Sequence, residues 1–309
     1  MMRTLLLLTA MLQAQSAAPP PATDIYLVPL KAGLASLQAA RPTPVSAAPG
    51  YDNQPYFSPD GNRLLFAANR DGKQTDVYAF DRATGRVTQL TRTAENENSP
   101  TFVPEGAGPA GSFTVVQSEF EKGGGRPATP IQRLWRFNGD GTAPHLMLAN
   151  ISPVGYHAWI DADRLVLFVL GQAGKPSTLQ IASVKSGTAE IAAEGIGRSL
   201  HRIPGTRLAS FVHRETETEY WVKQIDVASR KIDRLVKVPE GNNERDMAWM
   251  PDGQTILMST GSKILSWTKS VDGWKEVFDA AAHQLGAVTR MAVAPKGDAI
   301  AIVVAEVKK

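Results

Sequence analysis

The chain has 309 residues, of which 43% are hydrophobic and 20% are charged, and its formal net charge is +3. This composition is that of an ordinary globular domain, so it excludes both a disordered chain and a bundle of membrane-spanning helices. The 33 Lys and Arg residues are scattered rather than clustered, so we expect no nucleic acid partner.

The first residues have the form of a secretory signal peptide. A basic start at Arg3 is followed by an apolar run over residues 5–12 and then by the small residues Ala14 and Ser16. The run is shorter than the roughly 20 residues that span a bilayer, so we expect no stable membrane insertion. The sequence therefore predicts a signal peptide over residues 1–16, cleaved after Ser16, and a Pro/Ala-rich linker over residues 17–23. A chain without cysteine that carries such a signal is typical of a periplasmic protein.

A repeated unit begins at residue 55. Its sequence PYFSPDG (55–61) is followed by an apolar run at 64–68, a polar turn at 69–72, and the strand patterns DVYAF (76–80) and VTQL (87–90). Short alternating segments divided by Gly, Pro, Asn and Asp predict four antiparallel strands. Such a unit forms one blade of a β-propeller.

The start of this unit recurs five more times, at intervals of 45, 57, 43, 47 and 44 residues. The aligned positions are Phe57, Phe102, Trp159, Arg202, Trp249 and Val293. Periods of this length are typical of propellers. The long second interval contains Gly- and Pro-rich stretches at 106–111 and 123–130, which we interpret as surface loops. The sequence therefore predicts an all-β fold, a six-bladed β-propeller with four-stranded antiparallel blades over residues 24–309.

The two ends of the chain are expected to share one blade. After the sixth repeat only one further strand pattern, residues 299–305, remains, so this blade lacks two strands. The segment DIYLVPL (24–30) matches the strand pattern DVYAFD (76–81) and precedes the first repeat. We therefore predict that N-terminal strands within residues 24–46 complete the last blade and close the ring, which removes exposed sheet edges.

The segments SPDG (58–61), NRDG (69–72), DVY (76–78) and QLT (89–91) together resemble the repeat of TolB-like β-propellers. This resemblance extends over about residues 24–305 and implies a periplasmic protein of the bacterial envelope. TolB itself carries a separate N-terminal α/β domain, and the sequence predicts no counterpart of it. The same repeat occurs in propellers attached to enzymes, so it predicts architecture better than function.

Motifs that dictate a reaction are not found in the sequence. GAGPAG (106–111) has the spacing of a dinucleotide-binding turn, but a strand pattern rather than a helix follows it, so we expect no cofactor. SWTK (266–269) has the spacing of an acyl-enzyme motif without the Lys-Thr-Gly segment that accompanies it. His157 and His201 lack the spacing of metal ligands, so we expect no metal.

Polar side chains precede each predicted inner strand. In a propeller these positions surround one mouth of the central channel, where converging polar groups would form a binding site. Polar caps of strand ends that bind only water are the alternative interpretation. The candidates are Asp52, Asn53, Glu97, Asn98, Tyr156, His157, Arg198, His201, Glu244, Arg245, Asp246 and Arg290, with Gln54 and Ser99 beside them.

Two classes of function are compatible with this pattern. Because no motif dictates a reaction, the sequence favours a non-catalytic binding or scaffold module for an envelope protein or a small polar ligand. The alternative is a hydrolase or lyase that acts on a sugar or peptide at the channel mouth. An enzyme predicts a deep pocket in which a histidine reaches a carboxylate or a second histidine, whereas a scaffold predicts a shallow funnel.

Overall fold

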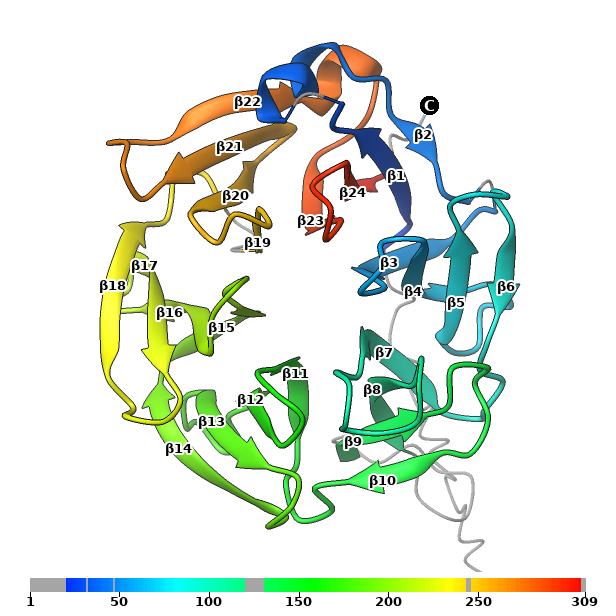
Figure 1. The fold of residues 1–309 in the computed structure, drawn as a ribbon, viewed down its shortest axis with the longest axis vertical. Coiled ribbons are helices and arrows are strands. Elements are labelled where there is room, and N and C mark those ends of the chain that lie inside the picture. Colours follow the sequence, from blue (N-terminus) through cyan, green and yellow to red (C-terminus); the bar gives the residue numbers. More distant parts are fainter. Residues whose placement is uncertain (1–20, 32, 47, 120–130, 243–245, 307–309) are drawn as a thin grey trace, which may run out of the picture.

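The computed structural model describes residues 21–31, 33–46, 48–119, 131–242 and 246–306. Within these ranges the chain forms strands β1 to β24 and two short 3₁₀ helices, η1 (Leu34–Ala39) and η2 (Ala280–His283). The predicted signal peptide, residues 1–16, lies outside the described residues. Figure 1 shows the sheets arranged in a ring, with β3, β7, β11, β15, β19 and β23 nearest its centre.

Four of the sheets have four antiparallel strands each, in chain order from the centre to the rim. The first contains β7 (Asn96–Phe102), β8 (Phe113–Glu119), β9 (Ile131–Phe137) and β10 (His145–Met147). The second contains β11 (Val154–Trp159), β12 (Arg164–Val169), β13 (Thr178–Ser183) and β14 (Thr188–Glu194). The third contains β15 (Ile196–Arg202), β16 (Leu208–Arg214), β17 (Tyr220–Asp226) and β18 (Ile232–Lys237). The fourth contains β19 (Met247–Trp249), β20 (Thr255–Thr260), β21 (Lys263–Thr268) and β22 (Lys275–Asp279).

The fifth sheet has eight strands and contains both ends of the described chain. One half consists of β3 (Tyr51–Phe57), β4 (Arg63–Asn69), β5 (Asp76–Asp81) and β6 (Val87–Gln89). The other half consists of β23 (Val288–Val293), β24 (Ala299–Ala305), β1 (Thr23–Pro29) and β2 (Thr43–Pro44). The halves meet at a single parallel pair, Thr23 and Tyr51, whereas β1 and β24 are paired antiparallel along their whole length.

The six aligned positions of the sequence repeat occupy the same place in six inner hairpins. In each hairpin the next residue donates its backbone N–H across the turn, at 2.8–2.9 Å; the donors are Ser58, Val103, Ile160, Ile203, Met250 and Ala294. Five of the six turns contain a glycine with a positive φ, for example +74° at Gly61 and +62° at Gly253, and the turn after Trp159 has none. A Cβ atom at Gly253 would lie 2.5 Å from the carbonyl oxygen of Pro204 in the preceding sheet, so the turns of neighbouring sheets require this glycine.

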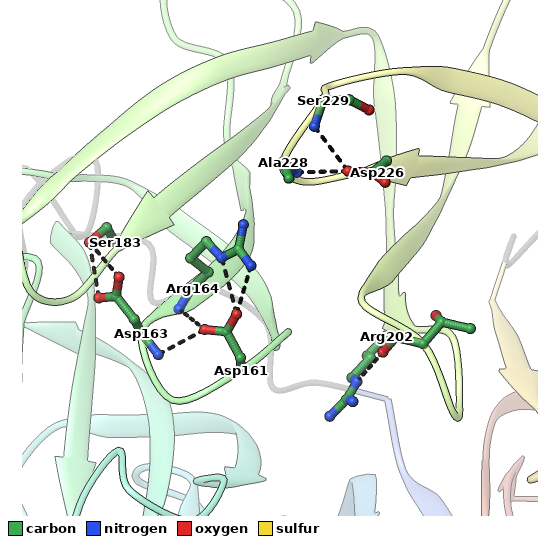
Figure 2. Close-up of polar contacts among 9 residues, drawn as sticks. Asp161, Asp163, Arg164, Ser183, Arg202, Asp226, Ala228 and Ser229 are labelled. Carbon is green, nitrogen blue, oxygen red and sulfur yellow. Dashed lines mark hydrogen bonds and ion pairs between the residues drawn. The ribbon is translucent and has the colours of Figure 1, made fainter.

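Aspartates in the turns satisfy backbone donors. Asp161 Oδ1 accepts from the N–H groups of Asp163 (3.0 Å) and Arg164 (2.9 Å), as Figure 2 shows. On a rim hairpin, Asp226 Oδ1 accepts from Ala228 (2.8 Å) and Ser229 (2.9 Å) in the same way (Figure 2). The turn aspartates of the repeat therefore have the structural role that turn chemistry predicts.

The core lies between neighbouring sheets rather than in one centre. Trp159 of β11 donates its indole N–H to Thr114 of β8 at 3.1 Å, and Trp249 of β19 donates to Ser210 of β16 at 2.8 Å. Each bond joins an inner strand to the preceding sheet, beside apolar side chains from both sheets. The aromatic residues of the repeat thus pack between sheets, as the sequence predicts. Among the described residues no helix has the length and apolar character needed to cross a membrane.

Candidate functional site

The described candidate residues lie within the inner strands and not before them, with Asp246 as the exception. The expectation was wrong because the strands continue through irregular pairing: the register shifts between Asn53 and Tyr56 and between Ile196 and Leu200. Such β-bulges bend a strand and redirect its side chains. In the sequence these polar residues interrupt the apolar alternation, so the strands seemed to begin only after them.

Two bulge residues adopt a backbone conformation that is uncommon for residues other than glycine. Gln54 has φ +58° and Ser99 has φ +53°, and the Ser99 N–H donates to Gln54 Oε1 at 2.6 Å. This bond connects β3 with β7 at the inner end of both sheets. Left-handed non-glycine residues are often found at functional sites, and both of these line the same pocket.

A cavity of about 170 Å³ lies between the inner strands. Residues of β3, β7, β11, β15 and β23 and residue 246 line it. The structure brings six of the predicted residues together here: Tyr156, His157, Arg198, His201, Asp246 and Arg290. Sequence reasoning missed Tyr56, Trp159 and Arg202, which also line the pocket, because the repeat alignment assigned them only to packing or turns.

Arg290 and Tyr156 form the central polar pair of the pocket. The Arg290 Nη2 donates to the Tyr156 hydroxyl at 3.2 Å, and its guanidinium carbon lies 5.2 Å from the centre of the Tyr156 ring. Burial raises the pKa of Tyr156, but the guanidiniums of Arg290 and Arg198 outweigh it, so the pKa is below its usual value. Burial lowers the pKa of Arg290, but Tyr156 and Asp246 outweigh it, so Arg290 stays charged.

The two pocket histidines are neutral at pH 7. Burial lowers the pKa of His157 to about 3, and it also lowers the pKa of His201. His157 Nε2 lies 2.7 Å from the hydroxyl of Thr114, and His201 Nε2 lies 3.2 Å from that of Ser199. Their side-chain hydrogen-bond partners within the described chain are therefore hydroxyl groups, and His201 also interacts with the backbone of Met247 and with the charge of Asp246. No group of three or more His, Cys, Asp and Glu side chains in this part of the chain could hold a metal ion.

Positive charge dominates the pocket. Among the described residues its lining includes the guanidiniums of Arg198, Arg202 and Arg290 and one carboxylate, that of Asp246. Asp246 is 3% exposed and accepts a hydrogen bond from the Met291 N–H at 3.2 Å. With both histidines neutral, the described lining has a net positive charge, so it favours anions over cations.

Asp52 and Asn53 do not line this pocket. The carboxylate of Asp52 is 1% exposed and forms an ion pair with Arg70. Burial raises the pKa of Asp52, and the neighbouring Arg70 opposes this shift. The side chain of Asn53 lies 3.4 Å from the Thr23 hydroxyl, which itself donates to the backbone of Asp52 at 2.8 Å. Both residues therefore connect β1 with β3.

Glu97 and Asn98 lie on β7, also outside the pocket. Glu97 is fully buried and accepts hydrogen bonds from Thr91 (3.0 Å), Gln117 (2.9 Å) and the hydroxyl of Thr93. Asn98 Oδ1 lies 3.4 Å from the Thr75 hydroxyl. These two residues join neighbouring sheets. The last two candidates, Glu244 and Arg245, lie outside the described residues.

Known structures share this fold. No protein-family model and no curated protein matches the chain. A candidate TolB from Agrobacterium tumefaciens matches with TM-score 0.69 at 15% identity, over 94% of this chain and 100% of that one. TolB from Acinetobacter baumannii matches with TM-score 0.57 at 12% identity, over 92% of this chain and 63% of that one. An oligogalacturonate lyase from Vibrio parahaemolyticus matches with TM-score 0.51 at 12% identity, over 83% and 89%. The fold is therefore a TolB-like propeller, as the repeat implies, and these identities carry the fold alone.

Proposed function

We propose that the chain is an exported periplasmic propeller that acts as a non-catalytic binding module, with the pocket between its inner strands as the binding site. The observation that carries this proposal is the convergence of six polar side chains from separate strands in one cavity. Strand caps would need only small polar residues, whereas this lining combines guanidiniums, imidazoles, a phenol and a carboxylate. The partner is an envelope protein or a small polar ligand.

In this proposal the propeller has six blades, and the N-terminal strands close its ring. The eight-stranded sheet divides into two blades where β1 and β3 share only one residue pair. The blade β23–β24–β1–β2 then contains both ends of the chain. Arg82 of the first blade adds an ion pair to Asp298 in the turn of the last, with nitrogen–oxygen distances of 3.2 and 3.3 Å. A closed ring would hold the pocket residues in fixed positions.

A binding role is supported by the contacts of the histidines. A general base in a hydrolase is usually oriented by a carboxylate, but His157 and His201 contact hydroxyl groups. Thr114, the partner of His157, also bonds Trp159, so His157 belongs to a packing network between sheets.

One observation favours the alternative, a lyase or hydrolase. Tyr156 has a lowered pKa and hydrogen-bonds Arg290, so its phenolate could act as a base. If the pocket is catalytic, prolonged incubation should consume the bound compound, and Tyr156→Phe should stop this conversion while binding persists. An unchanged compound after incubation with the native protein supports the binding role.

The binding role is tested by thermal stabilisation with a panel of sugars, amino acids, organic acids and short peptides. At least one compound should raise the melting temperature of the native protein, because a ligand that binds only the folded state stabilises it. This effect should be lost in the double variant Arg198→Ala, Arg290→Ala and kept in the control Arg63→Ala, Arg86→Ala. Both variants should retain the circular dichroism spectrum of the native protein. No stabilisation by any compound, or equal loss in both variants, would contradict the proposal.

A further inference from the structure

Among the aromatic side chains that line the pocket, Tyr56 of β3 is the most exposed, with 40% of its surface accessible. Burial nevertheless raises the pKa of its hydroxyl, so protein surrounds this side chain on most sides. A ring that is enclosed by protein and still accessible faces the cavity rather than the outer surface of the molecule. Tyr56 therefore offers an open aromatic face to a molecule that enters the pocket.

The fold does not require a tyrosine at the position of Tyr56. This residue pairs with Leu65 of β4, and the equivalent register position in the other inner hairpins holds a smaller side chain. These equivalent residues are Thr101, Ala158, His201, Ala248 and Ala292. Three of them are alanine, so packing of the blade does not explain the ring. A large accessible side chain without a packing role indicates contact with another molecule.

Arg202 of β15 is a second departure from the repeat in the same pocket. The aligned residue is a buried aromatic side chain in four other inner hairpins, at Phe57, Phe102, Trp159 and Trp249. Arg202 is instead exposed, and its Nε donates to the carbonyl oxygen of Thr206 at 2.8 Å (Figure 2). Within the described chain its guanidinium has no ion pair with a carboxylate. The charge of Arg202 lowers the pKa of Tyr56, so the two side chains are neighbours in the pocket.

The carboxylate in the described part of the lining lies beside a different arginine. Asp246 raises the pKa of Arg290, so the positive charge of Arg290 is already compensated inside the cavity. The Nη1 and Nη2 groups of Arg202 have no such partner among the described residues. An anion that enters the cavity can accept from both groups, as carboxylates do in bidentate geometry with arginine.

We propose that the pocket binds a small molecule that carries a ring and an anionic group, with the ring on Tyr56 and the anion on Arg202. An aromatic ring stacks on a tyrosine in offset geometry, and a sugar ring can place its C–H groups on the same face. Aromatic acids and sugar acids share this chemistry, and the experiment below distinguishes them. This inference rests on the proposed binding function and specifies the chemistry of its ligand.

Five compounds test the proposal by isothermal titration calorimetry on the native protein. Benzoate and glucuronate each carry a ring and a carboxylate, benzamide and glucose carry the ring without the charge, and acetate carries the charge without a ring. Benzoate or glucuronate should bind at least about tenfold more tightly than its neutral counterpart and than acetate, since one charge-assisted hydrogen bond accounts for such a ratio. The stronger of the two acids identifies the ligand class as aromatic acids or sugar acids.

Three outcomes with these compounds would contradict the proposal. Equal binding of each acid and its neutral counterpart would overturn the role of Arg202, and acetate binding as tightly as both acids would overturn the role of Tyr56. Binding of none of the five would overturn this inference, whereas another compound of the wider panel could still support the binding function.

Two variants and a control test the two side chains directly. Tyr56→Ala introduces the residue that three equivalent positions already hold, so it should fold, and it should weaken binding of the stronger acid about threefold or more. Arg202→Gln should weaken it about tenfold. Arg207→Gln, at an exposed position in the same hairpin and outside the pocket lining, should leave binding unchanged. Unchanged binding in Tyr56→Ala or Arg202→Gln would overturn the role of that residue, and the comparison among compounds on native protein stays informative if a variant fails to fold.

Discussion

Glu97 is a carboxylic acid with no exposed surface, in contrast to the pocket residues on the same inner strands. Burial raises its pKa to about 7, although hydrogen bonds from Thr93, Gln117 and Thr91 oppose the shift and Asp76 adds to it. The unfolded chain would titrate near 4.5. The folded state therefore holds this proton more tightly than the unfolded state, and the contribution of Glu97 to stability is lost as the pH rises from about 4.5 through about 7.

Replacing Glu97 with Gln should stabilise the protein at pH 8 and have little effect at pH 4.5. The amide keeps an acceptor for the neighbouring hydroxyls and removes the buried charge, which corresponds to roughly 3 kcal/mol at the higher pH. Urea unfolding of the native protein and the Glu97→Gln variant across this pH range measures the difference in stability.

His157 changes the stability with pH in the opposite sense. The unfolded chain takes up the proton of His157 below about 6.5, so the contribution of this residue to stability is lost as the pH falls. That effect is common to both proteins and cancels in the comparison. A difference that does not change with pH would contradict the prediction.

At the scale of elements, the sequence predicts the positions of the hairpin turns better than it predicts where the inner strands begin. The Pro-Asp-Gly turn has local chemistry, so aligning Phe57 with Trp249 across the chain identified equivalent hairpins. The bulges at Gln54 and Ser99 were not predictable, because neither residue is a typical left-handed residue and their bond joins two sheets. On these two strands the residues from the bulge onward line the pocket, while Asp52 and Glu97, which precede the bulges, face neighbouring sheets.

The N-terminal segment is the element whose loss should damage the protein most. Strand β1 pairs with β24 from Thr23 to Pro29, and Ile25, Val28 and Leu37 are fully buried. Deletion of residues 24–46 should therefore expose the edge of β24 and an apolar surface, which promotes aggregation. Size-exclusion chromatography and melting temperature measure the effect, with deletion of residues 17–20 as the control. A monomeric 24–46 deletion with an unchanged melting temperature would contradict the role of β1 in closing the ring.

At the scale of the whole molecule, the architecture was predictable because its repeat is a property of the sequence itself. The pocket was only partly predictable, since six of the ten described candidates line it and Arg202 joined them unforeseen. Which inner-strand side chains face a common cavity depends on bulges and on contacts between sheets. Neither is encoded in a single unit of the repeat.

Export of the whole chain depends on its first residues. The basic start, the apolar run over residues 5–12 and the small residues Ala14 and Ser16 predict a mature chain that begins at Ala17. This position leaves β1 intact, since its first residue is Thr23, and the absence of cysteine means that folding in an oxidising compartment needs no disulfide. Expressed in a Gram-negative host, the protein should appear in the periplasmic fraction with Ala17 as its first residue. N-terminal sequencing and intact mass measure this, and replacing Ala14 and Ser16 with Leu should block cleavage because bulky side chains do not fit the small-residue rule. Recovery of Met1 on the native protein, or cleavage that the two substitutions leave unchanged, would contradict the assignment.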